Sequence, residues 1–243
     1  MSRNAGVEAL LRVHYAPSNS SNPQTLLDNP PSQSHNIDRA SLERNGPLLQ
    51  TANLVCQRDH LDLFEPLNLA VQAGDCLELL GPNGSGKSTL LRTLAGLHSQ
   101  FTGEFDSAAL VYQGHRLGLD ELLSPLENLA WFAGLQDKTL DRSKALEVLA
   151  RLGLLEQART PCQRLSAGQQ RRAAIARWLL APQPLWLLDE PFNALDAQSQ
   201  QLLNELLGEH CAGGGAVICA THLILQVAEK TTVQLQPQSG GDL

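Results

Sequence analysis

Short apolar runs alternate with amphipathic stretches from about residue 47 onward, and this alternation is the main structural signal in the chain. Some runs are apolar at nearly every position, which predicts strands buried on both faces of a sheet. These runs are 76–80, 184–188 and 216–220. Other stretches repeat apolar residues at helical spacing. These are 89–96, 141–153 and 171–180. Strands that alternate with helices predict an α/β fold.

Residues 1–46 differ in composition from the rest of the chain. Stretches such as 18–23 and 29–34 contain only Ser, Asn, Pro and Gln, and they offer too little apolar area to offset the entropy of ordering. We predict a disordered N-terminal extension over 1–46, with a start site placed too far upstream as the alternative. One folded domain over 47–236 and a flexible tail over 237–243 are expected to follow.

Composition excludes several classes of protein. The 243 residues suffice for one α/β domain, and the net charge of −7 with scattered Lys and Arg predicts no nucleic-acid partner. A helix that spans a membrane needs about 20 apolar residues, and every apolar run in this sequence is far shorter. We therefore expect a soluble chain that reaches a membrane only through a partner. Five cysteines without a Cys-x-x-Cys pair indicate buried thiols in a reducing compartment rather than a metal or disulfide site.

A glycine-rich loop joins the first apolar run to the helix that follows it. We predict that this loop binds the phosphates of a nucleotide, and its residues are Gly81, Pro82, Asn83, Gly84, Ser85, Gly86, Lys87, Ser88 and Thr89. The glycines let backbone N–H groups turn toward an anion, Lys87 reaches the β- and γ-phosphates, and the Ser88 hydroxyl binds Mg²⁺. The next helix directs its N-terminus at the phosphates. A plain surface turn is the alternative, and the strand and helix on either side disfavour it.

A second apolar run ends in two carboxylates, Asp189 and Glu190. In a parallel sheet this end of the strand lies beside the phosphate loop. Asp189 is therefore predicted to hold Mg²⁺ together with Ser88. Glu190 is predicted to deprotonate the water that attacks the γ-phosphate. A helix-capping role is the alternative for either carboxylate.

Leu165-Ser-Ala-Gly-Gln-Gln170 begins another helix, with Ser166 as its N-cap. A hydroxyl, free backbone N–H groups and a helix N-terminus form a second anion site. The local sequence does not indicate which phosphate this second anion site would bind.

Together these motifs resemble the ATPase subunits of ATP-binding cassette (ABC) transporters, over roughly residues 48–225. The signature Leu-Ser-x-Gly-Gln matches 165–169, and Asn193-Ala-Leu-Asp196 is similar to the D-loop of that family. His222 matches the switch histidine, and Gln113 stands where the family has a glutamine between the phosphate loop and the helical subdomain. The resemblance implies a P-loop ATPase fold with a mostly parallel core sheet, an antiparallel β portion and a helical subdomain over about 115–165.

The resemblance also implies a mechanism. Two copies would pack head to tail as a homodimer, so that the signature of one closes on the ATP of the other. That signature comprises Ser166, Ala167, Gly168 and Gln169. Lys87 and His222 would stabilise charge on the γ-phosphoryl group, and Gln113 would join Ser88 and Asp189 at the metal. Asp196 would connect the two sites across the dimer. Mg²⁺ with ATP is the expected cofactor.

Arg58 occupies the position at which most of the family has an aromatic residue stacked on adenine. Its planar guanidinium can stack on a base, which makes Arg58 a candidate ATP contact. A solvent-facing arginine, with adenine held by apolar contacts alone, is the alternative.

The helical segment carries a capping box, Ser124-Pro-Leu-Glu127. Trp131 and Phe132 are candidate contacts for a membrane subunit, with core packing as the alternative.

Several passages, among them 112–115, 121–128 and 185–192, are similar to the cytochrome c biogenesis ATP-binding export proteins. This subfamily often has an aliphatic residue at the position of Gln113, so the glutamine here favours ordinary hydrolysis chemistry. The resemblance implies a multi-spanning permease as partner and a place on the cytoplasmic face of the inner membrane, peripheral through that permease. The expected function is ATP-driven heme delivery or export. The alternatives are the ATPase of another small ABC exporter and a soluble ABC ATPase without transport.

Overall fold

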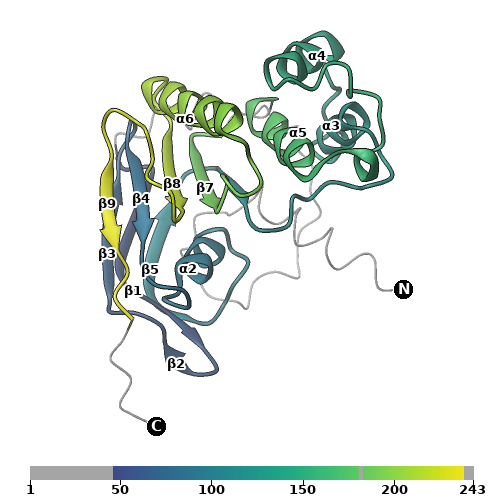
Figure 1. Ribbon diagram of the computed structural model, residues 1–243. Coiled ribbons are helices and arrows are strands. Elements are labelled where there is room, and N and C mark those ends of the chain that lie inside the picture. Colours follow the sequence, from purple (N-terminus) through teal and green to yellow (C-terminus); the bar gives the residue numbers. More distant parts are fainter. Residues whose placement is uncertain (1–45, 181–182, 238–243) are drawn as a thin grey trace.

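The computed structural model describes residues 46–180 and 183–237, and Figure 1 shows their arrangement. The predicted extension (1–46) and tail (237–243) lie outside this range, apart from Gly46 and Pro237. The structure combines a parallel sheet, an antiparallel sheet and a lobe of helices, which confirms the predicted fold class.

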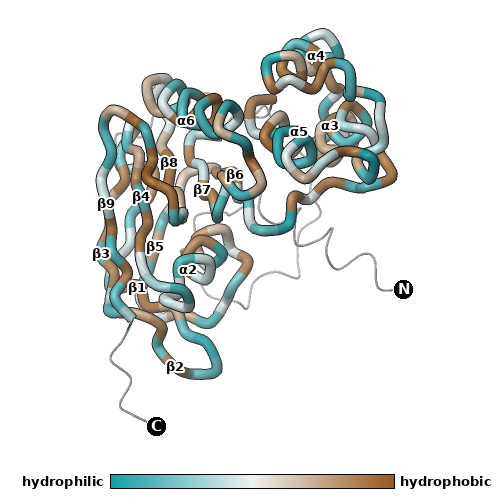
Figure 2. Tube along the Cα trace, viewed as in Figure 1, coloured by the Kyte–Doolittle hydropathy of each residue, from teal (hydrophilic) through white to brown (hydrophobic). Residues whose placement is uncertain are grey.

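The central sheet has five strands in the order β6-β7-β8-β4-β9, and every neighbouring pair is parallel. The strands are β4 (Cys76–Leu80), β6 (Leu110–Gln113), β7 (Leu185–Asp189), β8 (Ala216–Ala220) and β9 (Thr231–Gln234). Three of them, β4, β7 and β8, coincide with the apolar runs that predicted buried strands. Figure 2 shows the hydrophobic character of β8 along its whole length.

Both faces of the inner strands β4, β7 and β8 are covered, because alternate residues of these strands enter different cores. On β7, Leu185 and Leu187 pack with the antiparallel sheet, whereas Trp186 and Leu188 pack with the helical lobe. A strand with no solvent face needs apolar side chains at every position, which explains the unbroken runs in the sequence.

The antiparallel sheet is built on β1 (Leu49–Arg58), which pairs with β2 (Leu61–Asp62), β3 (Leu67–Val71) and β5 (Phe101–Ser107). Helix α2 (Lys87–Leu94) packs against both sheets and joins them. On the opposite side, α6 (Ala197–Ala212) covers β8 and β4 (Figure 1).

The helical lobe contains α3 (Pro125–Gly134), α4 (Arg142–Arg151), the 3₁₀ turn η2 (Cys162–Arg164) and α5 (Ala167–Leu180). Helix α5, which begins just beyond the predicted 115–165 segment, packs against both α3 and α4. The predicted capping box begins α3: the Ser124 hydroxyl accepts from the Glu127 amide, and the Glu127 carboxylate accepts from the Ser124 amide.

The five cysteines are all buried, as the apolar runs around Cys56, Cys76 and Cys219 indicated for those three. Among the described residues, no helix has the length and apolar character needed to cross a membrane.

Candidate active site

The phosphate loop lies between β4 and α2 and has the backbone that its glycines predicted. Gly84 and Gly86 have φ angles of 84° and 93°, a region that side chains with a Cβ rarely adopt. A Cβ on Gly86 would also lie 2.8 Å from Cδ1 of Phe64. The Lys87 ammonium folds back over the loop, where Nζ donates to the carbonyl oxygens of Gly81 at 2.7 Å and Pro82 at 3.1 Å. The amine is thus already held above the loop.

A hollow of about 650 Å³ opens beside this loop. It is lined by the loop, by the end of β7 and by His222, and its volume is within the range of small-molecule sites. The lining includes six of the residues predicted to bind ATP from the loop: Asn83, Gly84, Gly86, Lys87, Ser88 and Thr89.

Two of the three residues predicted to hold Mg²⁺, Ser88 and Asp189, meet at the wall of the hollow. Ser88 Oγ donates to Oδ1 of Asp189 over 3.1 Å, and Asp189 is only 3% exposed. A hydroxyl and a carboxylate are hard oxygen ligands, which fit Mg²⁺ bound through a few protein groups and a triphosphate.

Glu190 follows directly and faces His222, with 3.3 Å between Glu190 Oε1 and His222 Nε2 (side chains 12% and 59% exposed). Glu190 has a φ of 51°, an uncommon conformation for a residue other than glycine. Its amide donates to the Ala220 carbonyl over 2.8 Å, which ties the end of β7 to the end of β8. Backbone strain of this kind is concentrated at functional sites, because the surrounding structure must hold it.

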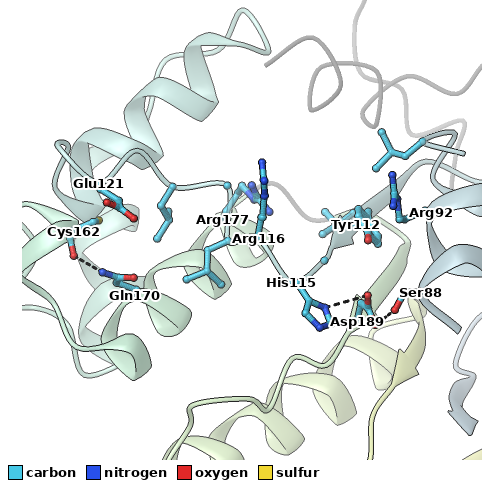
Figure 3. Close-up of a pocket in the computed structure, with 16 residues that line it drawn as sticks. Ser88, Arg92, Tyr112, His115, Arg116, Glu121, Cys162, Gln170, Arg177 and Asp189 are labelled. Carbon is cyan, nitrogen blue, oxygen red and sulfur yellow. Dashed lines mark hydrogen bonds and ion pairs between the residues drawn. The ribbon is translucent and has the colours of Figure 1, made fainter. Parts of the chain in front are cut away.

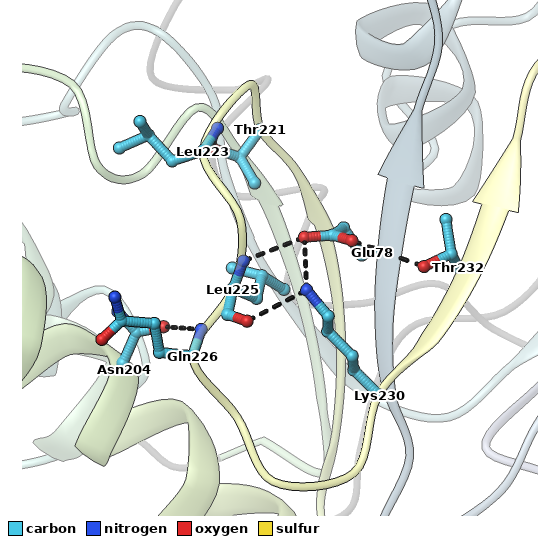
Figure 4. Close-up of polar contacts among 8 residues, drawn as sticks. All are labelled: Glu78, Asn204, Thr221, Leu223, Leu225, Gln226, Lys230 and Thr232. Carbon is cyan, nitrogen blue, oxygen red and sulfur yellow. Dashed lines mark hydrogen bonds and ion pairs between the residues drawn. The ribbon is translucent and has the colours of Figure 1, made fainter.

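The segment after His222 is fixed by a buried carboxylate, as Figure 4 shows. Glu78 on β4 accepts hydrogen bonds from the Leu225 amide at 2.9 Å and from Lys230 Nζ at 3.1 Å. The Lys230 ammonium also donates to the Leu225 carbonyl over 3.0 Å. No local sequence pattern indicates this support, because Glu78 is far along the chain from Leu225 and Lys230.

Gln113 is not brought to the metal site. Its side chain is 1% exposed, and Oε1 accepts from Arg177 Nη2 at 3.0 Å and from Trp178 Nε1 at 3.4 Å. Burial lowers the pKa of Arg177 to about 10, and this buried guanidinium needs an acceptor that Gln113 supplies. In this structure α5 thus holds the Gln113 side chain, and its contact with the metal stays a prediction.

The side chain that does reach Asp189 from this part of the chain is His115. Its Nδ1 lies 3.5 Å from Asp189 Oδ2, whereas Ser88 contacts the other carboxylate oxygen, Oδ1 (Figure 3). Sequence reasoning missed this residue. The available signal was a polar side chain just past the carboxyl end of a parallel strand, the edge of the sheet at which ligands bind.

Arg58 lines the hollow at the end of β1, with an exposed side chain whose Nε lies 4.0 Å from Asp59 Oδ2. Phe132, by contrast, is buried, and the guanidinium carbon of Arg177 lies over its ring, 4.6 Å from the ring centroid. Core packing therefore accounts for Phe132.

The signature segment begins α5 and stands apart from the hollow. Ser166 Oγ accepts from the Gln169 amide at 3.2 Å, and Gln169 Oε1 accepts from the Ser166 amide at 2.9 Å. Neither residue lines the nucleotide hollow. Asp196 caps α6 by accepting from the Ser199 amide over 2.8 Å.

The fold and this site define a phosphate-loop nucleotide-binding protein with a candidate general base. Comparison makes the class specific: the family described as "ABC transporter" matches residues 64–193. The chain belongs to this family of ABC transporter ATP-binding subunits, and the match supports the predicted ATPase activity.

Proteins similar to this chain have a more specific name within the ABC transporter family. The cytochrome c biogenesis ATP-binding export protein CcmA of Hahella chejuensis is 43% identical over 78% of this chain and 96% of its own length. The protein of the same name from Pseudomonas savastanoi is 45% identical over 72% of this chain and 88% of its own length. These relatives confirm the resemblance that the local sequence predicted.

Solved structures agree on the fold. An ABC transporter ATP-binding protein from Pyrococcus furiosus has a TM-score of 0.68 at 21% identity and covers 77% of this chain and 96% of its own. A metal-chelate type ABC transporter in an inward-facing conformation has a TM-score of 0.67 at 28% identity, covering 78% and 80%.

Proposed function

We propose that this chain is the ATP-hydrolysing subunit of an ABC transporter complex that serves heme delivery in the biogenesis of c-type cytochromes. The observation that carries the ATPase step is the position of Glu190, which faces His222 across the hollow beside the phosphate loop. The relatives named for cytochrome c biogenesis support the cellular role.

The residues of the chain divide the work of hydrolysis among them. The loop amides and Lys87 hold the β- and γ-phosphates, and Glu190 accepts a proton from the attacking water. His222 orients Glu190 and donates toward the γ-phosphoryl oxygens. Ser88 and Asp189 would hold Mg²⁺, which would neutralise charge that develops on the phosphates. Arg58 contacts the base from the rim of the hollow.

The complete site needs a second copy of the chain. The segment comprising Ser166, Ala167, Gly168 and Gln169 offers an anion site that no phosphate within the same copy reaches, since it lies outside the hollow. In a head-to-tail homodimer this segment closes on the ATP of the other copy, and Asp196 lies at the seam. Hydrolysis separates the copies, and a multi-spanning permease in the inner membrane responds to that motion from its cytoplasmic side.

The domain boundaries that the sequence predicts are kept in this proposal. We keep 47–236 as the ATPase domain, with the helical subdomain of about 115–165 as the part that meets the permease.

The test uses Glu190→Gln in the full-length chain, with the exposed Glu147→Gln on α4 as the control for charge. The Glu190 variant should bind ATP, lose turnover and elute as a dimer only when ATP is present. Glu147→Gln should match the wild type. A Glu190→Gln protein that stays monomeric with ATP, or that still hydrolyses it, would contradict the mechanism.

The cellular role needs a separate experiment. A strain that lacks the gene should lose covalently bound heme in its c-type cytochromes, and the wild-type gene, but not Glu190→Gln, should restore it. Normal c-type cytochromes in that strain would exclude heme delivery and favour the ATPase of another small exporter.

A further inference from the structure

The loop that follows β6 passes between two hollows on its way to the helical lobe. One is the nucleotide hollow, and the other, of about 1070 Å³, lies between the parallel sheet and the lobe. Ser88, His115 and Asp189 line both. Figure 3 shows the imidazole of His115 extending from this loop toward the Asp189 carboxylate. His115 thus stands at the point where the two hollows meet.

Gln113 has no spare hydrogen-bonding capacity for the metal site. Its carbonyl oxygen is shared between two donors from α5, Arg177 and Trp178. Its amide donates to the carbonyls of Gly114 at 3.0 Å and Arg116 at 2.9 Å. If the side chain swung toward Asp189, it would leave a buried guanidinium and an indole N–H without an acceptor, a costly change.

These contacts give Gln113 a different task. By binding the carbonyls on both sides of His115, the amide fixes the short segment from which the imidazole projects. The same side chain is held by α5 of the helical lobe through Arg177. Gln113 therefore anchors the His115 loop to the lobe.

We propose that His115, rather than Gln113, is the positioning residue of this loop for the bound Mg²⁺–triphosphate. His115 Nδ1 lies 3.5 Å from Oδ2 of Asp189, and in the proposed role a proton on Nδ1 is directed at that oxygen. This contact fixes the rotation of the carboxylate and leaves Oδ1, beside the Ser88 hydroxyl, directed at the metal. The inference rests on the proposed ATPase function, and it assigns His115 no direct contact with the reacting atoms.

Hydrogen-bonding partners that orient a ligating side chain are worth a measurable part of metal affinity, and their removal typically costs about tenfold or more. Because His115 acts on Asp189, its loss should weaken the binding of Mg²⁺–ATP but not the binding of ATP without the metal. This distinction separates a positioning role from a general effect on the loop.

The experiment compares His115→Ala, His115→Asn and Gln113→Met in the full-length chain. ATP binding is measured by calorimetry over a series of Mg²⁺ concentrations and in EDTA, and ATP turnover is measured over the same series. We expect His115→Ala to need about tenfold more Mg²⁺ for half-maximal ATP binding, with unchanged affinity in EDTA. Its turnover deficit should shrink as Mg²⁺ rises.

The two other variants test the geometry. An asparagine amide can take the place of Nδ1, so His115→Asn should recover most of the Mg²⁺ affinity. Gln113→Met keeps the volume but removes the acceptor of Arg177 and the donor to the loop carbonyls, so it should lower the melting temperature and change the Mg²⁺ requirement less than His115→Ala does.

Wild-type Mg²⁺ dependence in His115→Ala would overturn the inference and leave the proposed ATPase intact. A larger change in Mg²⁺ dependence for Gln113→Met than for His115→Ala would also overturn the inference. The same holds if the defect of His115→Ala is not relieved in His115→Asn and is accompanied by a lower melting temperature. A wild-type chain that binds no ATP at any Mg²⁺ concentration would instead reject the proposed function itself.

Discussion

Glu190 and His222 follow the ends of two neighbouring strands of the parallel sheet, β7 and β8, and their side chains meet with 3.3 Å between Oε1 and Nε2. The amide of Glu190 is bonded to the carbonyl of Ala220, so the two strand ends are fixed to each other by the backbone as well. The contact therefore depends on the register of β7 against β8. A single-residue slip of either strand would separate the base from the histidine.

His222→Ala should slow hydrolysis while leaving ATP binding nearly intact. The imidazole orients the base and donates toward the developing charge, and the loss of one such donor costs roughly 100-fold or more in kcat. Because the His222 side chain is mostly exposed, the melting temperature should remain within about a degree of the wild type. Steady-state turnover with separately measured ATP affinity checks this. A variant with wild-type kcat would show that His222 takes no part in the reaction.

Lys87→Met should abolish tight ATP binding. The ammonium is held above the loop by the Gly81 and Pro82 carbonyls, and a hydrogen bond to a charged group contributes about 1.5–3 kcal/mol. We expect ATP affinity to fall at least about tenfold. Lys144→Met on the exposed face of α4 removes the same charge elsewhere and serves as the control in calorimetry. Equal affinities in the two variants would contradict the role assigned to Lys87.

The parts of the site that sequence predicted are those whose geometry is local. The phosphate loop needs only its own glycines and the strand and helix beside it, and the placement of Asp189 and Glu190 follows from the end of one buried strand. The antiparallel strands gave a much weaker signal, because β5 has no buried residue and an exposed face needs no apolar run.

The position of Gln113 has a non-local cause. The glutamine shares with Val111 the face of β6 that packs on the helical lobe, and there its Oε1 accepts from the buried Arg177 of α5, a residue that only the fold brings near. His115, two positions on, is then left to face Asp189. A motif identifies the residue types that a loop offers, but the packing of the helical lobe decides which of them reaches the nucleotide.

Lys230→Met should destabilise the fold and slow turnover together. It removes a cation from the buried Glu78 carboxylate, and breaking a buried pair in this way costs about 3–5 kcal/mol. Because Lys230 also holds the Leu225 carbonyl, the segment after His222 should loosen. Thermal unfolding and kcat are the measurements, with the exposed Lys138→Met as the control. An unchanged melting temperature would show that the pair contributes nothing to stability.

The same carboxylate predicts a pH dependence of stability. Burial alone would raise the pKa of Glu78, but hydrogen bonds from the Leu225 amide, Lys230 and Thr232 outweigh it and lower the pKa. A carboxyl group with a lowered pKa stabilises the fold above its unfolded pKa of about 4.3, and this contribution is lost as the pH falls through the lower folded value. The wild type should therefore lose more stability on acidification than Glu78→Gln. Parallel loss in both, measured by denaturant unfolding across acidic pH, would contradict the assignment.

Ser166→Asp tests whether the signature acts on the ATP of another copy. Aspartate caps a helix as well as serine does, so α5 should begin as before and the melting temperature should hold. The added negative charge, however, would face the triphosphate of the partner copy in a closed dimer. Because Ser166 lies outside the hollow of its own copy, each monomer should still bind ATP with wild-type affinity. In the Glu190→Gln background, Ser166→Asp should prevent the ATP-dependent dimer, whereas Ser166→Asn, an equal cap without the charge, should leave much more of it. Size-exclusion chromatography with and without ATP distinguishes the two. If both variants dimerise equally well, no phosphate approaches Ser166, and the head-to-tail arrangement is wrong.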